Sequence, residues 1–152
     1  MRNVLLAAAA AVMGCSPQAA APRPLDRSPA GLEQLALTVH SGVSTHRFTV
    51  EVARSPEEQA RGLMYRQSLA PDRGMIFPYD PPQPVGFWMK NTLIPLDMIF
   101  IRKDGTIANI AENTVPLSLE MVPSDGPVAA VLEIAGGRSA ELGIKAGDKV
   151  SW

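Results

Sequence analysis

The chain has 152 residues and a formal net charge of −1 at pH 7, and 19% of its residues are charged. This length is sufficient for one domain with a buried core, and the balanced charge argues against a nucleic-acid partner. The one cysteine, Cys15, excludes a disulfide within the chain and a zinc site built from several thiolates.

The first residues show the pattern of a bacterial export signal. Arg2 precedes a continuous apolar run at residues 4–13, which is too short to cross a bilayer because a spanning helix needs about 20 residues. The run ends in Val12-Met13-Gly14-Cys15, which resembles a lipobox, the site where a diacylglyceryl group is attached to a cysteine thiol. We therefore predict that residues 1–14 are a signal peptide and that Cys15 is the lipidation site.

Lipidation at Cys15 predicts a protein anchored to a membrane of the cell envelope and facing the periplasm. Several acyl chains on one residue hold a protein stably, whereas a single chain binds only marginally. Ser16 stands where retention in the inner membrane usually uses aspartate, so the outer membrane is favoured if the organism has one. The alternative is a soluble periplasmic protein that is cleaved among the alanines at residues 19–21.

The segment behind the cysteine has the composition of a linker. Residues 16–30 contain four prolines and no aromatic residue, so they cannot form a core of their own. We predict that residues 15–31 comprise the lipidated cysteine and a flexible linker, and that residues 32–152 form a single β-rich domain.

The domain is expected to begin with a β-hairpin. Apolar and polar residues alternate at 35–40 and at 48–52, which is typical of half-buried strands. Residues 41–45 are suited to a turn that joins the two strands in antiparallel fashion.

A helix is predicted at about residues 55–65. Ser55 is a favourable N-cap, Pro56 suits the first helical position, and Glu58 completes a capping box. The spacing of its apolar residues predicts a buried face made of Ala60, Leu63 and Met64.

The remaining elements are short. Residues 74–77 are expected to form a strand and residues 78–84 a rigid surface loop, because four prolines exclude a helix or a central strand there. Residues 112–125 are expected to be irregular, and residues 138–142 to form one helical turn. Further strands are expected at residues 85–90, 96–102, 106–111, 128–134 and 149–152.

These elements predict a mainly β fold, at the border of the α+β class. Many short strands at close spacing indicate a compact antiparallel domain, barrel-like or a sandwich, with one packed helix at about residues 55–65. A parallel sheet is not expected, because no long helices alternate with the strands.

The most apolar and aromatic stretch of the predicted domain is residues 87–101, FWMKNTLIPLDMIFI. Lys90, Asn91 and Asp97 stand within it, and polar groups in such surroundings must be paired or face a cleft. In one interpretation, Lys90 and Asp97 meet across a strand ladder and Asn91 holds the bend between the strands. In the other, these residues line a polar pocket with an aromatic floor made of Phe87, Trp88 and Met89.

From Phe48 onward the chain resembles the family called domain of unknown function 192, also named uncharacterised protein family 0127. The resemblance implies a small β-rich single domain, often exported or lipid-anchored, and it implies no established activity. It rests on Arg61–Met64, Gly74–Phe77, Phe87–Asp97, Asp104–Gly105, Val131–Glu133 and Gly143–Asp148.

We favour a non-enzymatic, envelope-tethered module that binds a small molecule, a glycan or an envelope protein near residues 87–97. The question of enzymatic activity stays open, and we assign no catalytic residue. Arg61 or Arg66 is expected to pair with a buried acid, either Asp97 or Glu133. The candidate ligand-binding residues are Trp88, Lys90, Asn91, Asp97, Arg61 and Glu133.

The alternative is a hydrolase that acts on carbohydrate or on the cell wall. It would use Asp97 with Glu112 or Glu133, and it requires both carboxylates in one open cleft. A third possibility is a purely structural role for the polar residues of the central stretch. No cofactor and no metal site are predicted, because the methionines are spaced as core residues rather than as a cluster of soft ligands.

Overall fold

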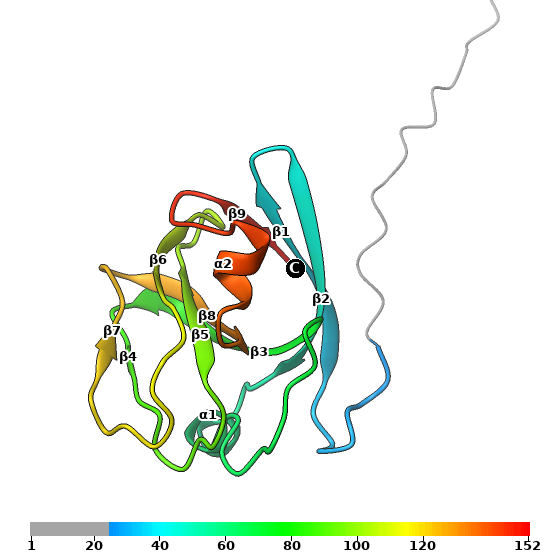
Figure 1. Cartoon of the computed structure of the whole chain (residues 1–152), viewed down its shortest axis with the longest axis vertical. Helices are drawn as coiled ribbons and strands as arrows, with labels where there is room; N and C mark the ends of the chain where they lie inside the picture. Colours follow the sequence, from blue (N-terminus) through cyan, green and yellow to red (C-terminus); the bar gives the residue numbers. More distant parts are fainter. Residues whose placement is uncertain (1–24) are drawn as a thin grey trace, which may run out of the picture.

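The computed structural model describes residues 25–152, and this part of the chain contains nine strands and two helices (Figure 1). The strands are β1 (Gln34–Ser41), β2 (Ser44–Val52), β3 (Arg73–Gln83), β4 (Gly86–Phe87), β5 (Leu96–Ile101), β6 (Ile107–Ala111), β7 (Val122–Pro123), β8 (Val128–Ala135) and β9 (Lys149–Ser151). The helices are α1 (Pro56–Arg61) and α2 (Arg138–Leu142). Seven strands form one curled, half-barrel sheet in the order β6-β5-β8-β3-β2-β1-β9, and β4 pairs with β7. The prediction of a mainly β fold is confirmed.

The predicted signal peptide, residues 1–14, and the lipidation site at Cys15 lie outside the described residues. The described end of the predicted linker lies against the start of the sheet. Leu25 forms an isolated bridge with Gln34, and the Ser28 amide donates to the Leu32 carbonyl at 2.9 Å. Within residues 25–152, no helix combines the length and the apolar composition needed to cross a bilayer.

The first two strands form the predicted antiparallel hairpin. Leu37 is aligned with Phe48, and Leu35 with Val50, across the ladder. Leu37, Phe48 and Val50 are buried, because alternate side chains of each strand face the core. The alternation that predicts these strands therefore also predicts which of their faces is covered.

β2 and β3 are parallel neighbours, with Val50 aligned with Gly74. Every other adjacent pair of the seven-stranded sheet in residues 25–152 is antiparallel, so the expectation of an antiparallel sheet is wrong at this pair. A parallel pair needs a crossover of a dozen or more residues, which residues 53–72 supply. The crossover carries α1 to one end of the half-barrel (Figure 1).

The start of α1 agrees with the prediction from the sequence, but its end does not. The Glu58 amide donates to the Ser55 hydroxyl, and the Ser55 amide donates to the Glu58 carboxylate, which completes the predicted capping box. The helix ends at Arg61 because Gly62 adopts a positive φ of 47°. The predicted buried face is therefore wrong: Ala60 is exposed, and Leu63 is buried from the turn that follows the helix.

The proline-rich segment differs from its prediction. β3 continues through residues 78–83 rather than ending in a surface loop, although its pairing with β8 is interrupted between Pro78 and Gln83. The strand expected at residues 85–90 is reduced to the two residues of β4. Its partner β7 lies within the segment that was expected to be irregular.

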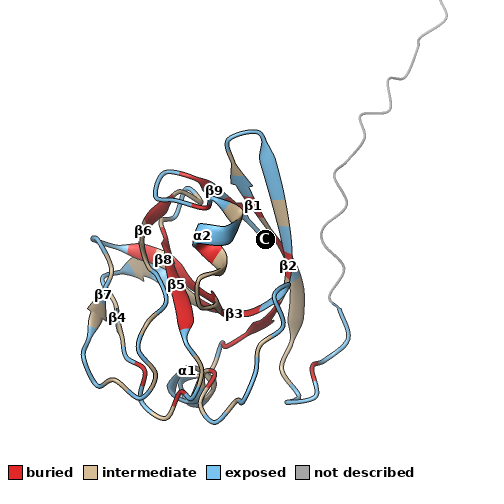
Figure 2. Ribbon diagram, viewed as in Figure 1, coloured by how far each residue is buried: buried red, intermediate tan, exposed pale blue. Residues whose placement is uncertain are grey.

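The central strands are covered on both faces, and all six residues of β5 are buried. Ile99 and Ile101 belong to one hydrophobic cluster, whereas Met98 and Phe100 belong to another. Buried residues are concentrated on β5, β8 and β3 (Figure 2). Successive residues of these strands therefore point into different cores, and this alternation decides where their polar side chains lie.

Candidate functional site

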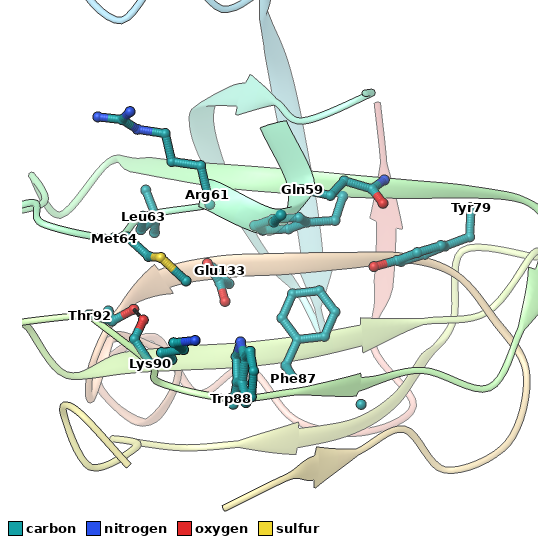
Figure 3. A pocket seen from close by; sticks show the side chains of 14 residues that line it. Gln59, Arg61, Leu63, Met64, Tyr79, Phe87, Trp88, Lys90, Thr92 and Glu133 are labelled. Carbon is teal, nitrogen blue, oxygen red and sulfur yellow. Dashed lines mark hydrogen bonds between the residues drawn. The ribbon is translucent and has the colours of Figure 1, made fainter. Parts of the chain in front are cut away.

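A cavity of about 210 Å³ opens beside α1 (Figure 3). Its walls come from α1 and the turn after it, from β3, from β4 with the segment that follows, and from the middle of β8. These elements are far apart in the sequence, and the parallel β2–β3 connection is what brings α1 to this place. The residues that contribute side chains with chemical function are Gln59, Arg61, Tyr79, Trp88, Lys90, Thr92 and Glu133.

Glu133 is the acid of this cavity. It lies on β8 opposite Met75 of β3 and Met98 of β5, so its side chain leaves the sheet on the side of the hydrophobic cluster that contains Met98 and Phe100. Only 5% of the residue is exposed. Figure 3 shows its carboxylate between Met64, Phe87 and Trp88.

The environment of Glu133 disfavours its charged form. Within residues 25–152, its carboxylate has no salt bridge and accepts no hydrogen bond. Desolvation by burial raises the pKa of Glu133 to about 8. Burial, with a smaller contribution from the Glu133 charge, raises the pKa of Tyr79 to about 12. A carboxyl of this kind holds a proton near neutral pH unless a cation or a set of donors joins it.

Aromatic rings form one side of the cavity. The ring centroids of Phe77 and Phe87 are 5.0 Å apart with an interplanar angle of 86°, an edge-to-face arrangement that such rings prefer. Gly62 allows the turn after α1 to approach these rings, since a Cβ atom there would lie 3.3 Å from Cζ of Phe77. Trp88 is 45% exposed, and the ammonium of Lys90 lies 5.1 Å from the centre of its ring.

Gln59 fixes the position of α1 against β3. Its side-chain amide donates to the carbonyls of Ala53, at 3.2 Å, and Pro78, at 3.1 Å. Gln59 and Tyr79 are absent from the residues that the sequence selected. The sequence does not point to them, because Gln59 lies outside the predicted buried face of its helix and Tyr79 lies in a stretch whose prolines predict a loop.

Asp97 lies elsewhere. It is fully buried, and its carboxylate accepts hydrogen bonds from the amides of Asn113 at 2.7 Å, Gly137 at 2.8 Å and Ser139 at 2.6 Å. Gly137 is the N-cap of α2 and has no side chain to cap it, so Asp97 of β5 supplies the acceptor. The expected pair of Lys90 and Asp97 is wrong, because Lys90 is exposed and lies over Trp88.

Asn91 lies in the bend after β4, but its side chain does not bond the backbone of that bend, contrary to what one of the two interpretations expected. Its φ of 55° lies in the left-handed region that asparagine tolerates better than most residues. Its carbonyl accepts the Tyr65 amide at 2.9 Å, and its side-chain amide lies 3.7 Å from the sulfur of Met64. Asn91 therefore joins the turn after α1 to the segment after β4, beside the cavity.

The arginines do not pair as expected. Arg61 lines the cavity, but its guanidinium points away from Glu133 (Figure 3). Arg66 forms a salt bridge of 2.6 Å with Glu51 instead of pairing with Asp97 or Glu133. This pair lies at a second, larger cavity of about 360 Å³, whose buried acid is thus already neutralised. The smaller cavity is the better candidate site, because its acid has no such partner.

The carboxylates named for a hydrolase are not brought into one cleft. Asp97 is aligned with Ile134, and Glu133 with Met98, so the two side chains leave the sheet on opposite faces. Glu112 is exposed and lines neither cavity. Among residues 25–152, no three side chains of His, Cys, Asp or Glu are grouped so that they could hold a metal ion.

Residues 37–152 match the DUF192 family, described as "Uncharacterized ACR, COG1430". The chain is similar to a protein of unknown function from Novosphingobium aromaticivorans DSM 12444, with 49% identity and a TM-score of 0.82 over 88% of this chain and 94% of that one. It is also similar to a Sinorhizobium meliloti 1021 protein provisionally described as a transcription regulator, with 44% identity and a TM-score of 0.77 over 79% of this chain and 94% of that one. No curated protein matches the chain. The chain belongs to the DUF192 family.

Proposed function

We propose that this protein is a non-enzymatic binding module of the cell envelope and that the cavity beside α1 receives a small molecule. The observation that carries the proposal is the Glu133 carboxyl, which is buried in the wall of the cavity without a partner. Among the described residues, the buried polar side-chain atoms without a partner are those of His46 and Ser139, so the Glu133 oxygens still reach the space of the cavity. A carboxyl that is open on this side and unpaired on the protein side can pair with a ligand that enters. Perturbed titratable groups in a concave site are a recognised mark of binding or catalysis.

The shape of the cavity supports a small ligand. Its volume of about 210 Å³ is below the roughly 300–1,000 Å³ of pockets for drug-sized molecules. A single compact group fits this volume better than a long glycan chain does. Trp88 stands half exposed at the mouth and offers an apolar face to whatever enters.

The tether is a separate part of the proposal. The lipobox-like residues 12–15 support acylation of Cys15, and the proline-rich segment behind them supports a spacer between the membrane and the domain. The domain would then face the periplasm, from the outer membrane where the organism has one. A module in this place meets small molecules that enter or leave the envelope.

The cavity is tested by blocking it. We would record ligand-observed NMR spectra of a fragment library against the full chain in detergent micelles, for the wild type and two variants. Ala60→Phe places a ring at the mouth from an exposed helical position that lines the cavity, and Glu57→Phe places the same ring on α1 at an exposed position outside it.

The proposal expects fragments that bind the wild type and Glu57→Phe but lose binding to Ala60→Phe. If no fragment depends on an open cavity, the cavity is not a binding site and the proposal is overturned. Retained folding of both variants is checked by their thermal unfolding curves.

A further inference from the structure

We infer that the ligand of this cavity is an organic ammonium ion, a protonated amine on a short apolar stem, which is held between the Glu133 carboxylate and the aromatic side chains around it. The inference rests on the proposed function and adds the charge and the shape of the ligand. Three features of the described residues carry it: the missing counter-ion of Glu133, the aromatic lining and the size of the cavity.

No cation of the described residues is paired with the carboxyl of Glu133 in this cavity. Glu133 is the only acid that lines it, and within residues 25–152 no lysine, arginine or histidine forms a salt bridge with it. The two cations of the lining, Lys90 and Arg61, are both exposed. A buried carboxylate is stabilised either by a cation or by a set of hydrogen-bond donors, as the three amides at Asp97 illustrate. Glu133 has neither among the described residues, and a cationic ligand would supply the missing partner.

The aromatic lining favours the same class of ligand. Phe77, Tyr79, Phe87 and Trp88 all contribute to the walls, and the negative faces of such rings attract ammonium groups. The structure contains one such contact already, between the Lys90 ammonium and the Trp88 ring at 5.1 Å. An anion would be repelled both by the faces of these rings and by the carboxylate of Glu133.

The volume limits the stem that carries the amine. A cavity of about 210 Å³ holds a short alkyl chain or one small ring in addition to the ammonium group. Phe87 and Leu63 offer such a stem apolar contact, and the Thr92 hydroxyl beside them is buried and donates to the Lys90 carbonyl at 3.3 Å. The ligand is therefore a compact amine, free or at the end of a larger molecule that stays outside.

Binding should be coupled to the release of one proton. In the empty cavity the pKa of Glu133 is about 8, so below that pH the carboxyl must lose its proton before it can pair with an ammonium ion. The other groups at the cavity are Tyr79 on β3, Lys90 after β4 and Arg61 on α1. Tyr79 stays neutral in this range because its pKa is about 12. Affinity should therefore rise almost tenfold per pH unit between pH 6 and 7 and level off above pH 8.

The test compares three probes of one shape, n-butylamine, n-butanol and butyrate. Dissociation constants are measured by NMR titration of the full chain in detergent micelles at pH 6, 7 and 8. Wild type is compared with Glu133→Gln, which removes the charge with little change of shape, and with Glu112→Gln, which removes a charge from an exposed acid outside the cavity.

At pH 8 we expect n-butylamine to bind wild type and Glu112→Gln at least tenfold more tightly than the other two probes, and Glu133→Gln to lose this preference. Equal binding of the three probes, a preference for butyrate, or an amine affinity that is the same at pH 6 and pH 8 would overturn the inference while leaving the cavity a binding site. If Ala60→Phe weakens the binding of no fragment of any chemical class, the proposed function is overturned as well. If Glu133→Gln does not fold, the probe comparison and the pH series on wild type still decide the question.

Discussion

Asp97 and Glu133 lie on the adjacent strands β5 and β8, one step apart in register, and their side chains leave the sheet in opposite directions. Asp97 is aligned with Ile134, and Glu133 with Met98. On one face, three backbone amides occupy the Asp97 carboxylate. On the other face, Glu133 borders an open cavity without a partner. Asp97 thus accepts hydrogen bonds that position α2, whereas Glu133 has no such partner among the described residues.

Replacing Asp97 tests its structural role. Asp97→Asn keeps one acceptor oxygen but turns an NH₂ group toward an amide that needs an acceptor. Leaving buried donors unsatisfied costs about 1–3 kcal/mol each, so we expect the free energy of unfolding to fall by about 3 kcal/mol. Denaturant unfolding of the purified protein measures it.

The matched control for that change is Asp125→Asn. Asp125 is exposed, and its 3.6 Å contact with Arg102 lies on the surface. Surface pairs of this kind contribute about 0–1 kcal/mol, so this variant should unfold much as wild type does. Equal losses in the two variants would refute the assigned role of Asp97.

The raised pKa of Glu133 predicts how stability depends on pH without ligand. Between the unfolded value of 4.5 and the folded value of about 8, the folded state binds the extra proton. Stability from this group is therefore complete below pH 4.5 and decreases as pH rises toward 8, by up to about 1.4 kcal/mol per pH unit. Glu133→Gln removes the titration, so the variant should gain on wild type from pH 5 to pH 8 in parallel unfolding experiments. A constant difference across that range would show that Glu133 titrates normally.

We expect that replacing Gly74 even by alanine destabilises the protein. A Cβ atom there would lie 2.5 Å from the Glu133 carbonyl oxygen and 3.1 Å from Cγ2 of Ile134. Because backbone cannot move aside cheaply, Gly74→Ala should destabilise the protein by about 3 kcal/mol, the upper end for overpacking. Gly42→Ala is the comparison: its φ of +57° is unfavourable for alanine, but nothing lies within 4 Å, so about 1 kcal/mol is expected. A Gly74→Ala protein no less stable than Gly42→Ala would mean that β3 and β8 separate easily.

The anchor is tested at Cys15. If the thiol carries the lipid, Cys15→Ala should leave the protein out of the membrane fraction, since no other acylated residue is expected. Mass spectrometry of wild type should give a mature chain that begins at residue 15 and carries acyl groups. Membrane retention of Cys15→Ala would argue against this anchor, and an unmodified terminus at residues 19–21 would favour the alternative of a soluble periplasmic protein.

The sequence predicts what is set by neighbouring residues. Alternation identifies the β1–β2 hairpin, and Ser55 with Glu58 identifies the start of α1, because both signals depend on a few positions close together. The parallel pairing of β2 with β3 has no such signal. It is decided by how residues 53–72 pack, which is a property of the whole fold.

The candidate site can be predicted from the sequence only in part, for the same reason. Glu133 and Trp88 stand out in the sequence because an acid in an apolar strand and an aromatic beside charges are unusual. The residues that lie beside them cannot be identified in the same way, because contacts between strands depend on the register of pairing. That register places Asp97 and Glu133 on opposite faces of the sheet. The sequence does not indicate Tyr79, because the prolines around it predict a loop, whereas β3 continues through this segment in the structure.

The last strand of the described chain pairs with the first: Val150 of β9 is aligned with Val39 of β1 and is buried against it. During synthesis, the amino-terminal hairpin must wait for this strand to arrive before the edge of its sheet is covered. A chain with this order stays incompletely folded until nearly all of it has been made. If the predicted signal peptide directs export, that delay would keep the chain unfolded for passage through a translocation channel.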